Sequence, residues 1–405
     1  MASRLDLILT LGLYQRLGAA EVVQKLGKRQ VAYASVYGIL QKLKAEGYVN
    51  SENEKFYLTK KSEKLFKLVY FCFSNDIDYN KVISEKTAEF VKIGLENGII
   101  EGLPFDTKTV KRIVDVLSKH GFAAVESRKP FSCRIVHSAF LERLVENFFG
   151  RPEVKCPELA ECVDESKVDS RLEREFSAYK KLSKEKAHFD EIGFIHSSLS
   201  LEGNTLTLPE TERLIKENIP PTSKPFKDAQ QVLDYKKALD SFIYSDKKIT
   251  EEEILEFHRT AMNSLQAGAG KFRLQNVQIR GNPDFKLPDW HELPVLLKNF
   301  FEEANRGNGK KVSASAIIGE AAFLHNEFQR IHPFVDGNSR TARAIFIKML
   351  IQNGFPLVKI PVGFSGQYMK LTKLSRKRDD KKFSLLMKII VLENLKAAAK
   401  KLEYA

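Results

Sequence analysis

Cysteine is scarce in this 405-residue chain, which has four, at Cys72, Cys133, Cys156 and Cys162, and no C-x-x-C pair. This spacing fits neither a disulfide framework nor a structural zinc site, so free thiols in a reducing compartment are expected. With 43% hydrophobic and 10% aromatic residues, the chain can bury two or three ordinary cores, which excludes a wholly disordered or collagenous chain. No apolar run reaches the roughly 18 residues of a membrane span, and the first residues lack a signal-peptide pattern. We therefore expect a cytoplasmic protein without a membrane segment.

The net charge of +13 is concentrated at the two ends of the chain. Residues 1–68 carry 12 Lys and Arg against 6 Asp and Glu, and residues 366–405 carry 11 against 4, while the residues between them balance. A basic end can contact nucleic acid or an acidic partner. The run Lys370 to Lys382 also contains Asp379 and Asp380, so we expect it to form a solvated helix face.

The first 68 residues have the pattern of a winged helix-turn-helix domain. A short helix is predicted over 19–26, a second begins at Ser35 and ends at Gly47, and residues 48–58 alternate like a hairpin. This order resembles a DNA-reading module. Its plausible phosphate contacts are Lys25, Lys28, Arg29, Lys42 and Lys44. Glu52 and Glu54 in the predicted wing would repel DNA, so docking to protein or dimerisation is an equal alternative.

Residues 69–165 repeat part of this pattern. Thr107 can cap a helix with apolar residues at helical spacing up to Leu117, and two strand-like stretches follow at 122–125 and 131–136. This segment is either a second winged-helix-like unit or a helical and hairpin connector. Residues 166–405 are strongly helical apart from 270–288, which we expect to be a hairpin turning at Gly281-Asn282. The expected fold is therefore mainly α.

Chemistry-bearing residues gather in one loop between two apolar helices, at residues 332–343. Gly337 and Asn338 precede a helix start, where backbone N–H groups and the helix dipole favour an anion. Arg340 and Arg343 are three residues apart and can hold a polyphosphate. Asp336 can ligate Mg²⁺ beside substrate phosphates, and His332 can act as a base. Together these residues predict phosphoryl or nucleotidyl transfer.

This run resembles the Fic motif, H-x-F-x-[DE]-G-N-G-R-x-x-R, of Fic-domain protein adenylyltransferases. Every fixed position matches except Ser339, where glycine is usual. The resemblance covers roughly residues 171–390 and implies ATP as substrate and Mg²⁺ as cofactor. It implies His332 as the general base, Asp336 on the metal and Gly337, Asn338 and the Ser339 backbone around the phosphates, with Arg340 and Arg343 on the outer phosphates. Serine at a position needing positive φ would be strained, so nucleotide preference becomes open.

Two further segments resemble parts of the same family. Ser198 to Gly203 is similar to the inhibitory motif [ST]-x-x-x-E-[GN], on a helix expected over about 184–203, and the resemblance implies that Glu202 pairs with Arg343. Residues 270–288 resemble the flap that pairs with an extended target segment. The flap residues expected to contact the target are Asn276, Val277, Gln278 and Ile279.

The resemblance implies an auto-inhibited enzyme that transfers AMP from ATP to a hydroxyl of a target protein or of itself. Two alternatives stay open. One is removal of AMP from a modified protein, with Glu202 positioning water, and the other is a DNA-binding regulator whose Fic-like domain senses nucleotide. A homodimer that holds the inhibitory helix is also compatible with the sequence.

Overall fold

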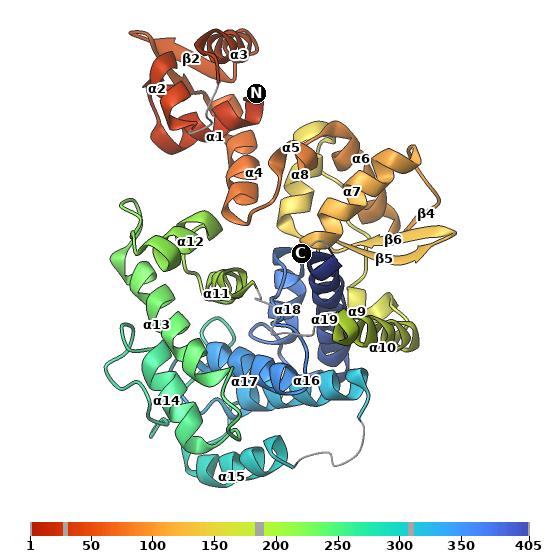
Figure 1. Cartoon of the computed structure of the whole chain (residues 1–405), viewed down its shortest axis with the longest axis vertical. Helices are drawn as coiled ribbons and strands as arrows, with labels where there is room; N and C mark the ends of the chain where they lie inside the picture. The colour runs from red at the N-terminus through yellow and green to blue at the C-terminus, as the bar shows by residue number, and fades with distance from the viewer. Residues whose placement is uncertain (1, 27–30, 183–189, 307–311, 404–405) are drawn as a thin grey trace. The chain divides into compact units, whose positions relative to one another are not determined.

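The computed structural model describes residues 2–26, 31–182, 190–306 and 312–403. The chain forms two compact units, Met1–Cys156 and Pro157–Ala405. As predicted, the fold is mainly helical, with two small antiparallel sheets (Figure 1). Cys72 and Cys133 are buried, and Cys156 and Cys162 are partly buried. In the described ranges no helix combines the length and apolarity needed to cross a membrane.

The first unit contains both sheets. Its elements are α1 (Arg4–Tyr14), β1 (Leu17–Gly18), α2 (Ala19–Lys25), α3 (Tyr33–Ala45), β2 (Val49–Glu52), β3 (Lys55–Leu58), α4 (Glu63–Ser74), α5 (Tyr79–Val82), α6 (Glu85–Asn97), β4 (Ile100–Glu101), α7 (Thr107–Lys119), β5 (Ala123–Arg128), β6 (Phe131–Ile135) and α8 (Ala139–Phe149).

The N-terminal part of this unit contains the two helices and the hairpin expected from the sequence. Helices α2 and α3 precede the β2–β3 hairpin, in which Ser51 lies opposite Phe56. Strand β1, which the sequence did not predict, adds to β3 and gives the sheet order β1-β3-β2. The predicted phosphate contacts Lys28 and Arg29 lie outside the described residues.

The following sheet has the order β4-β6-β5. In chain order, one helix, α7, stands between β4 and β5, whereas two helices, α2 and α3, stand between β1 and β2. The second sheet is therefore preceded by one helix where the first sheet has the two helices of a helix-turn-helix. Asp106, rather than Thr107, caps α7, because the Asp106 carboxylate accepts the backbone N–H of Thr109 at 3.0 Å.

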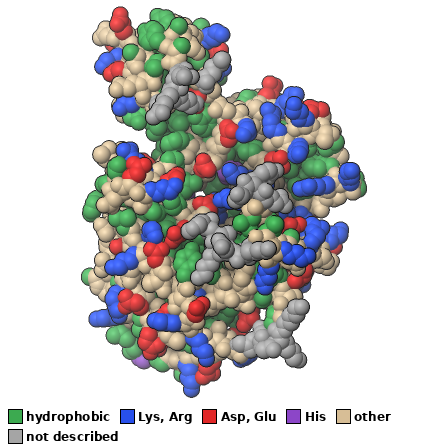
Figure 2. Space-filling model, viewed as in Figure 1, with side chains coloured by type: hydrophobic (Ala, Val, Ile, Leu, Met, Phe, Trp, Pro, Cys, Tyr) green, Lys and Arg blue, Asp and Glu red, His purple; other side chains and the backbone are tan. Residues whose placement is uncertain are grey.

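The second unit is a helical assembly. Its helices are α9 (Leu159–Cys162), α10 (Glu165–Leu182), α11 (Glu191–Ser200), α12 (Leu208–Glu217), α13 (Phe226–Phe242), α14 (Glu251–Ala261), α15 (Leu293–Ala304), α16 (Ala314–Ile331), α17 (Asn338–Gln352), α18 (Ser365–Leu371) and α19 (Asp380–Glu403). On the face in Figure 2, acidic and basic side chains are interspersed over this unit.

The core of the second unit is built on α16 and α17. Helix α16 packs against α17 and α19, and α10 packs along α19 (Figure 1). Leu324, Phe328 and Ile331 on α16 and Ile345 and Leu350 on α17 are fully buried, as their helical spacing predicts. Burial of each such side chain stabilises the fold by about 1.5–3 kcal/mol. The loop between these two helices is thus held by the best-packed part of the unit.

Two expectations about local structure are wrong. Residues 270–288 form a loop with one isolated antiparallel bridge, Ile279 to Asn282, and not a two-stranded hairpin. The backbone there is bonded to neighbouring loops, which leaves no ladder between two strands. The basic run from Lys370 is not one helix face, because residues 372–379 connect α18 to α19 as a loop. The predicted helix at about 184–203 is described only as α11, and its residues 184–189 lie outside the described ranges.

Candidate active site

The motif loop needs two residues in the left-handed backbone region. His332 has φ 50° and ends α16, where its N–H donates to the Phe328 carbonyl at 2.9 Å. Gly337 has φ 85° and begins α17. A β-carbon at Gly337 would lie 2.8 Å from the Met262 sulfur and 2.9 Å from Nε2 of His258. Only glycine satisfies both the backbone angle and this close approach.

Asn338 closes the loop with its side chain. Its Oδ1 accepts the N–H of Phe334 at 2.9 Å, and its Nδ2 donates to the Phe334 carbonyl at 2.8 Å. The Phe334 ring is fully buried, so it anchors the loop in the core. The Asn338 side chain therefore builds the loop, and only its backbone N–H remains for an anion at the start of α17.

His258 on α14 packs against the motif loop. Sequence reasoning did not single out this residue. Its ring stacks on Phe334, with centroids 3.6 Å apart. Its Nε2–H donates to the Asp336 carbonyl at 2.9 Å, and its Nδ1 accepts the N–H of Gly270 at 2.9 Å. Burial lowers the pKa of His258 to about 4, which keeps the ring in this neutral form. A lone histidine on an apolar helix gives no sequence signal for such a position.

Arg273 ties the flap loop to the motif loop. Its Nε donates to the His332 carbonyl at 2.8 Å, and its Nη2 donates to the Pro288 carbonyl at 2.8 Å. Its backbone N–H donates to the Pro333 carbonyl at 2.8 Å. The side chain is buried, so these charge-assisted bonds fix both segments. The sequence pattern had suggested only a strand residue here.

His332 is poised as a neutral base. Its Nδ1 lies 3.2 Å from the Gln329 carbonyl, which can only accept, so Nδ1 carries the proton and Nε2 keeps its lone pair. Burial lowers the pKa of His332 to about 4, and the charge of Arg273 adds to the lowering. The ring is therefore unprotonated at neutral pH.

Arg340 is a buried cation with free donors. Its side chain is 4% exposed, and its Nη2 lies 3.6 Å from the Asp336 carboxylate. Its Nε and Nη1 have no hydrogen-bond partner among the residues that the structure describes. Because buried donors are normally paired, two orphaned donors at the start of α17 point to an anionic ligand.

Arg343, in contrast, is held by the segment that resembles an inhibitory motif. Its Nη2 donates to a Glu202 carboxylate oxygen at 2.9 Å and to the Ser198 carbonyl at 2.9 Å, and its Nε donates to the Ser198 hydroxyl at 2.8 Å. Burial opposes ionisation of Glu202, but the charges of Arg343, Arg340 and Lys373 prevail and lower its pKa. The pairing that the resemblance implied is thus present as a buried ion pair.

Ser339 carries no backbone strain. It lies inside α17 and is not among the residues with positive φ, so the expected left-handed penalty does not arise. The Gln329 amide donates to its hydroxyl at 3.1 Å. Serine at this position therefore adds a link between α16 and α17.

Asp336 is the candidate metal ligand. Its side chain is 67% exposed, and its Oδ1 accepts the N–H of Gly337 at 2.6 Å. The described residues contain no group of three or more potential protein ligands for a metal. A single carboxylate beside an anion site fits Mg²⁺, which is commonly held by one or two carboxylates, water and substrate phosphates.

Part of this set lines a cavity of about 470 Å³, whose lining includes Glu202, His332, Asp336, Gly337 and Arg340 but not Arg343, His258 or Arg273. The Asn338 and Ser339 positions and the expected flap residues Gln278 and Ile279 also line it. Asn276 and Val277 do not. Asn276 instead bonds within the flap, because its amide donates to the Asp289 carboxylate at 2.8 Å and its Oδ1 accepts the Trp290 N–H at 3.0 Å.

The comparisons with known proteins agree with this geometry. The Fic/DOC family model matches residues 248–350. The matched stretch contains His258, the flap loop and the whole motif loop. The chain is 28% identical to the protein adenylyltransferase Fic of Drosophila erecta over 213 residues, and 27% identical to that of Drosophila grimshawi over 225 residues. These matches cover 52% and 55% of this chain, but only 41% and 45% of the relatives.

Solved structures share the fold. A Fic-domain-containing signalling protein from Bacteroides thetaiotaomicron has a TM-score of 0.50 at 21% identity, covering 58% of this chain and 98% of that one. Fic-1 from C. elegans has a TM-score of 0.51 at 20% identity, covering 59% and 74%. The second unit therefore has a Fic-like fold.

Proposed function

We propose that this protein is an auto-inhibited protein adenylyltransferase that transfers AMP from ATP to a hydroxyl of a target protein or of itself. The single observation that carries the proposal is the cavity in which a neutral His332 faces a helix start together with a buried Arg340 that has free donors. Homology to Fic adenylyltransferases over half the chain supports the choice of nucleotide and reaction.

In the proposed reaction, the acceptor hydroxyl oxygen attacks the α-phosphorus of ATP while Nε2 of His332 takes the hydroxyl proton. The bond from the α-phosphorus to the bridging oxygen breaks, pyrophosphate leaves, and AMP remains esterified to the target. The backbone N–H groups of Asn338 and Ser339 and the free donors of Arg340 stabilise the negative charge of the phosphates. Asp336 would hold Mg²⁺, which supplies charge neutralisation at those phosphates.

We propose that Glu202 restrains this reaction by occupying Arg343. A guanidinium bonded to Glu202 and Ser198 keeps only Nη1 without a partner among the described residues, so it has less capacity for an outer phosphate. ATP would then bind without the contact that sets its productive pose. A charge-assisted hydrogen bond is worth about 1.5–3 kcal/mol, so restoring the contact corresponds to about a tenfold to hundredfold gain in rate.

The test is transfer of label from α-labelled ATP with Mg²⁺ onto the protein itself and onto cell extract. Wild type, Glu202→Gly and His332→Ala are compared. We expect label to rise about tenfold or more with Glu202→Gly and to vanish with His332→Ala. Equal labelling of wild type and Glu202→Gly would contradict the inhibitory role, and labelling that survives His332→Ala would contradict the role of the base.

Two outcomes of the same assay would favour the alternatives. Release of AMP from a modified protein that stops with Glu202→Gly would favour a de-AMPylating enzyme. Absence of label in every variant, combined with salt-sensitive binding of residues 1–68 to a specific DNA site, would favour a nucleotide-sensing regulator. The order of α2, α3 and the β2–β3 hairpin supports the proposal that these residues form a winged helix.

A further inference from the structure

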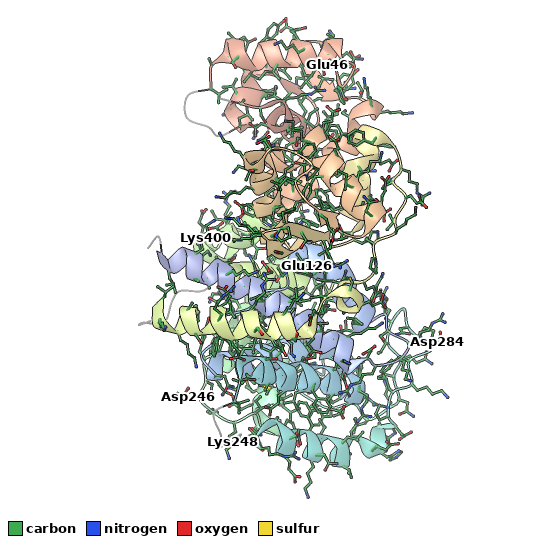
Figure 3. All side chains as sticks on the ribbon, turned by 90° about the vertical axis from the view of Figure 1, so that its right-hand side faces the viewer. Glu46, Glu126, Asp246, Lys248, Asp284 and Lys400 are labelled. Carbon is green, nitrogen blue, oxygen red and sulfur yellow. The ribbon has the colours of Figure 1, made fainter. Side chains whose placement is uncertain are left out.

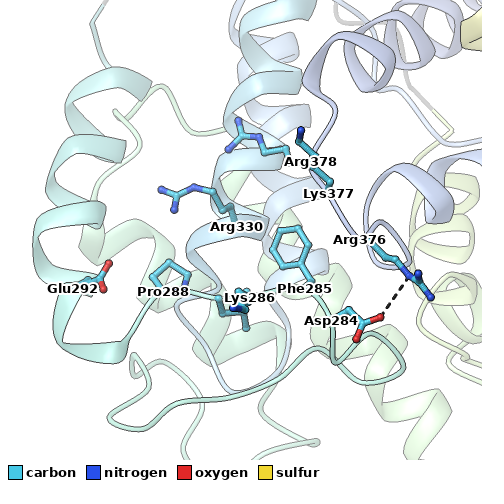
Figure 4. Close-up of a pocket in the computed structure, with 10 residues that line it drawn as sticks. Asp284, Phe285, Lys286, Pro288, Glu292, Arg330, Arg376, Lys377 and Arg378 are labelled. Atoms are coloured by element: carbon cyan, nitrogen blue, oxygen red, sulfur yellow. Dashed lines mark ion pairs between the residues drawn. The ribbon is translucent and has the colours of Figure 1, made fainter.

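We propose that a basic groove beside the active site binds an acidic stretch of the target protein, an inference that rests on the proposed function. A cavity of about 540 Å³ lies between the flap loop and the loop that precedes α19 (Figure 4). Its basic lining residues, which define the basic groove, are Lys286, Arg330, Arg376, Lys377 and Arg378. Phe285, Arg330 and Arg378 line the active-site cavity as well, so the two cavities are adjacent.

Three cations of the basic groove are available to a ligand. Lys286 and Lys377 are exposed and have no acidic partner in the described part of the chain. Arg376 lies 3.5 Å from Asp284, but both side chains are more than half exposed, and such a pair is worth little. Arg330 and Arg378 differ, because both pair with Glu327 and form the floor of the groove.

Both walls of the groove are fixed before any ligand binds. The Asn282 amide donates to the Lys373 carbonyl at 3.0 Å and to the Ser375 carbonyl at 2.6 Å, which joins the flap loop to the opposite wall. Arg273 holds the other end of the flap segment at the Pro288 carbonyl. A preorganised groove loses less conformational entropy on binding than a floppy surface.

The occupant that fits this groove is an acidic peptide segment. Phe285, Leu287 and Pro288 give it an apolar side, which suits side chains better than a phosphodiester backbone. Asp284 and Glu292 also line the groove, so its positive charge is discontinuous, which suits separate carboxylates of a peptide better than a continuous phosphodiester backbone. A target segment with its hydroxyl at His332 would run along the flap residues that line the active site and continue into the basic groove.

The test measures binding and transfer separately. Two fluorescein-labelled peptides each carry one threonine in an alanine and glycine background. One has a glutamate run before the threonine and the other has it after the threonine. Each peptide has a twin in which glutamine replaces glutamate. Binding to the full chain is followed by anisotropy at low salt. The groove variant is Lys286→Glu with Lys377→Glu. The matched control is Lys248→Glu with Lys298→Glu, two exposed lysines outside both cavities; Lys248 lies well away from Asp284 (Figure 3).

We expect one of the two glutamate peptides to bind at least about tenfold more tightly than its glutamine twin, and this preference to weaken as salt rises. The groove variant should lose the preference, and the control should keep it. Equal binding of the twins, or a preference that survives in the groove variant, would overturn the inference. Tighter groove-dependent binding of a single-stranded oligonucleotide would overturn it in favour of nucleic acid.

Self-labelling from α-labelled ATP in the Glu202→Gly background separates the two proposals. Self-labelling without a peptide preference contradicts the groove alone. Absence of label on both the protein itself and cell extract contradicts adenylyl transfer, whatever the peptides do. When both proposals are correct, the glutamate peptide that binds more tightly should accept AMP with a KM about tenfold lower than that of its glutamine twin, at a similar kcat.

Discussion

Two arginines one helical turn apart have different surroundings in this site. Arg343 is bonded to Glu202 and Ser198 and keeps one unpartnered nitrogen, Nη1, whereas Nε and Nη1 of Arg340 both have no partner in the described ranges. Both are almost fully buried, so their solvation cannot explain the difference. A buried cation already paired is held in place, and one with free donors is prepared for a ligand. Under the proposed function, Arg343 carries the restraint and Arg340 the capacity to bind phosphate.

The pKa of His332 leads to a prediction about pH. A folded-state pKa of about 4 lies below the usual 6.5, so the ring stays neutral and competent as a base down to acidic pH. We expect kcat/KM of the Glu202→Gly variant to be flat from about pH 8 to about pH 5.5 and to fall as pH approaches about 4. An acid limb centred near about 6.5 would contradict this environment for His332.

The Ser339–Gln329 contact leads to a second prediction at the residue scale. The hydrogen bond between the two side chains joins α17 to α16. We expect a double-mutant cycle with Ser339→Ala and Gln329→Ala to give a coupling of about 1 kcal/mol in the free energy of unfolding, measured by urea denaturation. Additive effects of the two substitutions would mean that the contact does not stabilise the fold.

At the scale of elements, the site is a loop stretched between α16 and α17 and supported by α14. Positive φ at His332 and Gly337 turns the chain out of one helix and into the next. Asn338 and the stacked rings of Phe334 and His258 hold the turn. The geometry of the anion site thus depends on helix packing as well as on the motif.

Gly337→Ala tests this dependence. A β-carbon there meets Met262 and His258, and the φ of 85° adds a penalty of about 1–2 kcal/mol. We expect a total loss of about 3 kcal/mol in the free energy of unfolding, together with loss of AMP transfer. The control is Gly366→Ala on α18, where a β-carbon meets nothing within 4 Å and stability should change little. Equal effects of both substitutions would contradict the proposed close approach.

At the scale of the whole molecule, the chain consists of two compact units, and the site belongs to one of them. The contacts of His332, Arg340 and Arg343 described above are all made by residues within Pro157–Ala405. That unit has its own core around α16 and α17. The first unit has its own sheets and helices.

A truncation tests this division. We expect the fragment Pro157–Ala405 carrying Glu202→Gly to fold cooperatively and to self-label within about twofold of the full-length Glu202→Gly variant. His332→Ala in the same fragment is the control for background labelling. A soluble, folded fragment without activity would mean that residues 1–156 contribute to catalysis.

Local patterns in the sequence determined the helices of the core and the composition of the motif loop. Helical spacing of apolar residues predicts α16 and α17, and residues 332–343 are contiguous, so their proximity follows from the chain itself. Ser339 shows the limit of such reasoning, because its expected strain depended on a backbone angle that the sequence does not specify.

Only the tertiary structure decided the contacts between distant segments. Glu202 and Arg343 are 141 positions apart, and their pairing was implied by a family resemblance rather than by any local pattern. His258 and Arg273 reach the motif loop from other elements, and the basic groove joins the flap to a loop expected to be a helix face. Such contacts arise when helices pack their apolar faces together, and local periodicity specifies which face is buried but not which partner it meets.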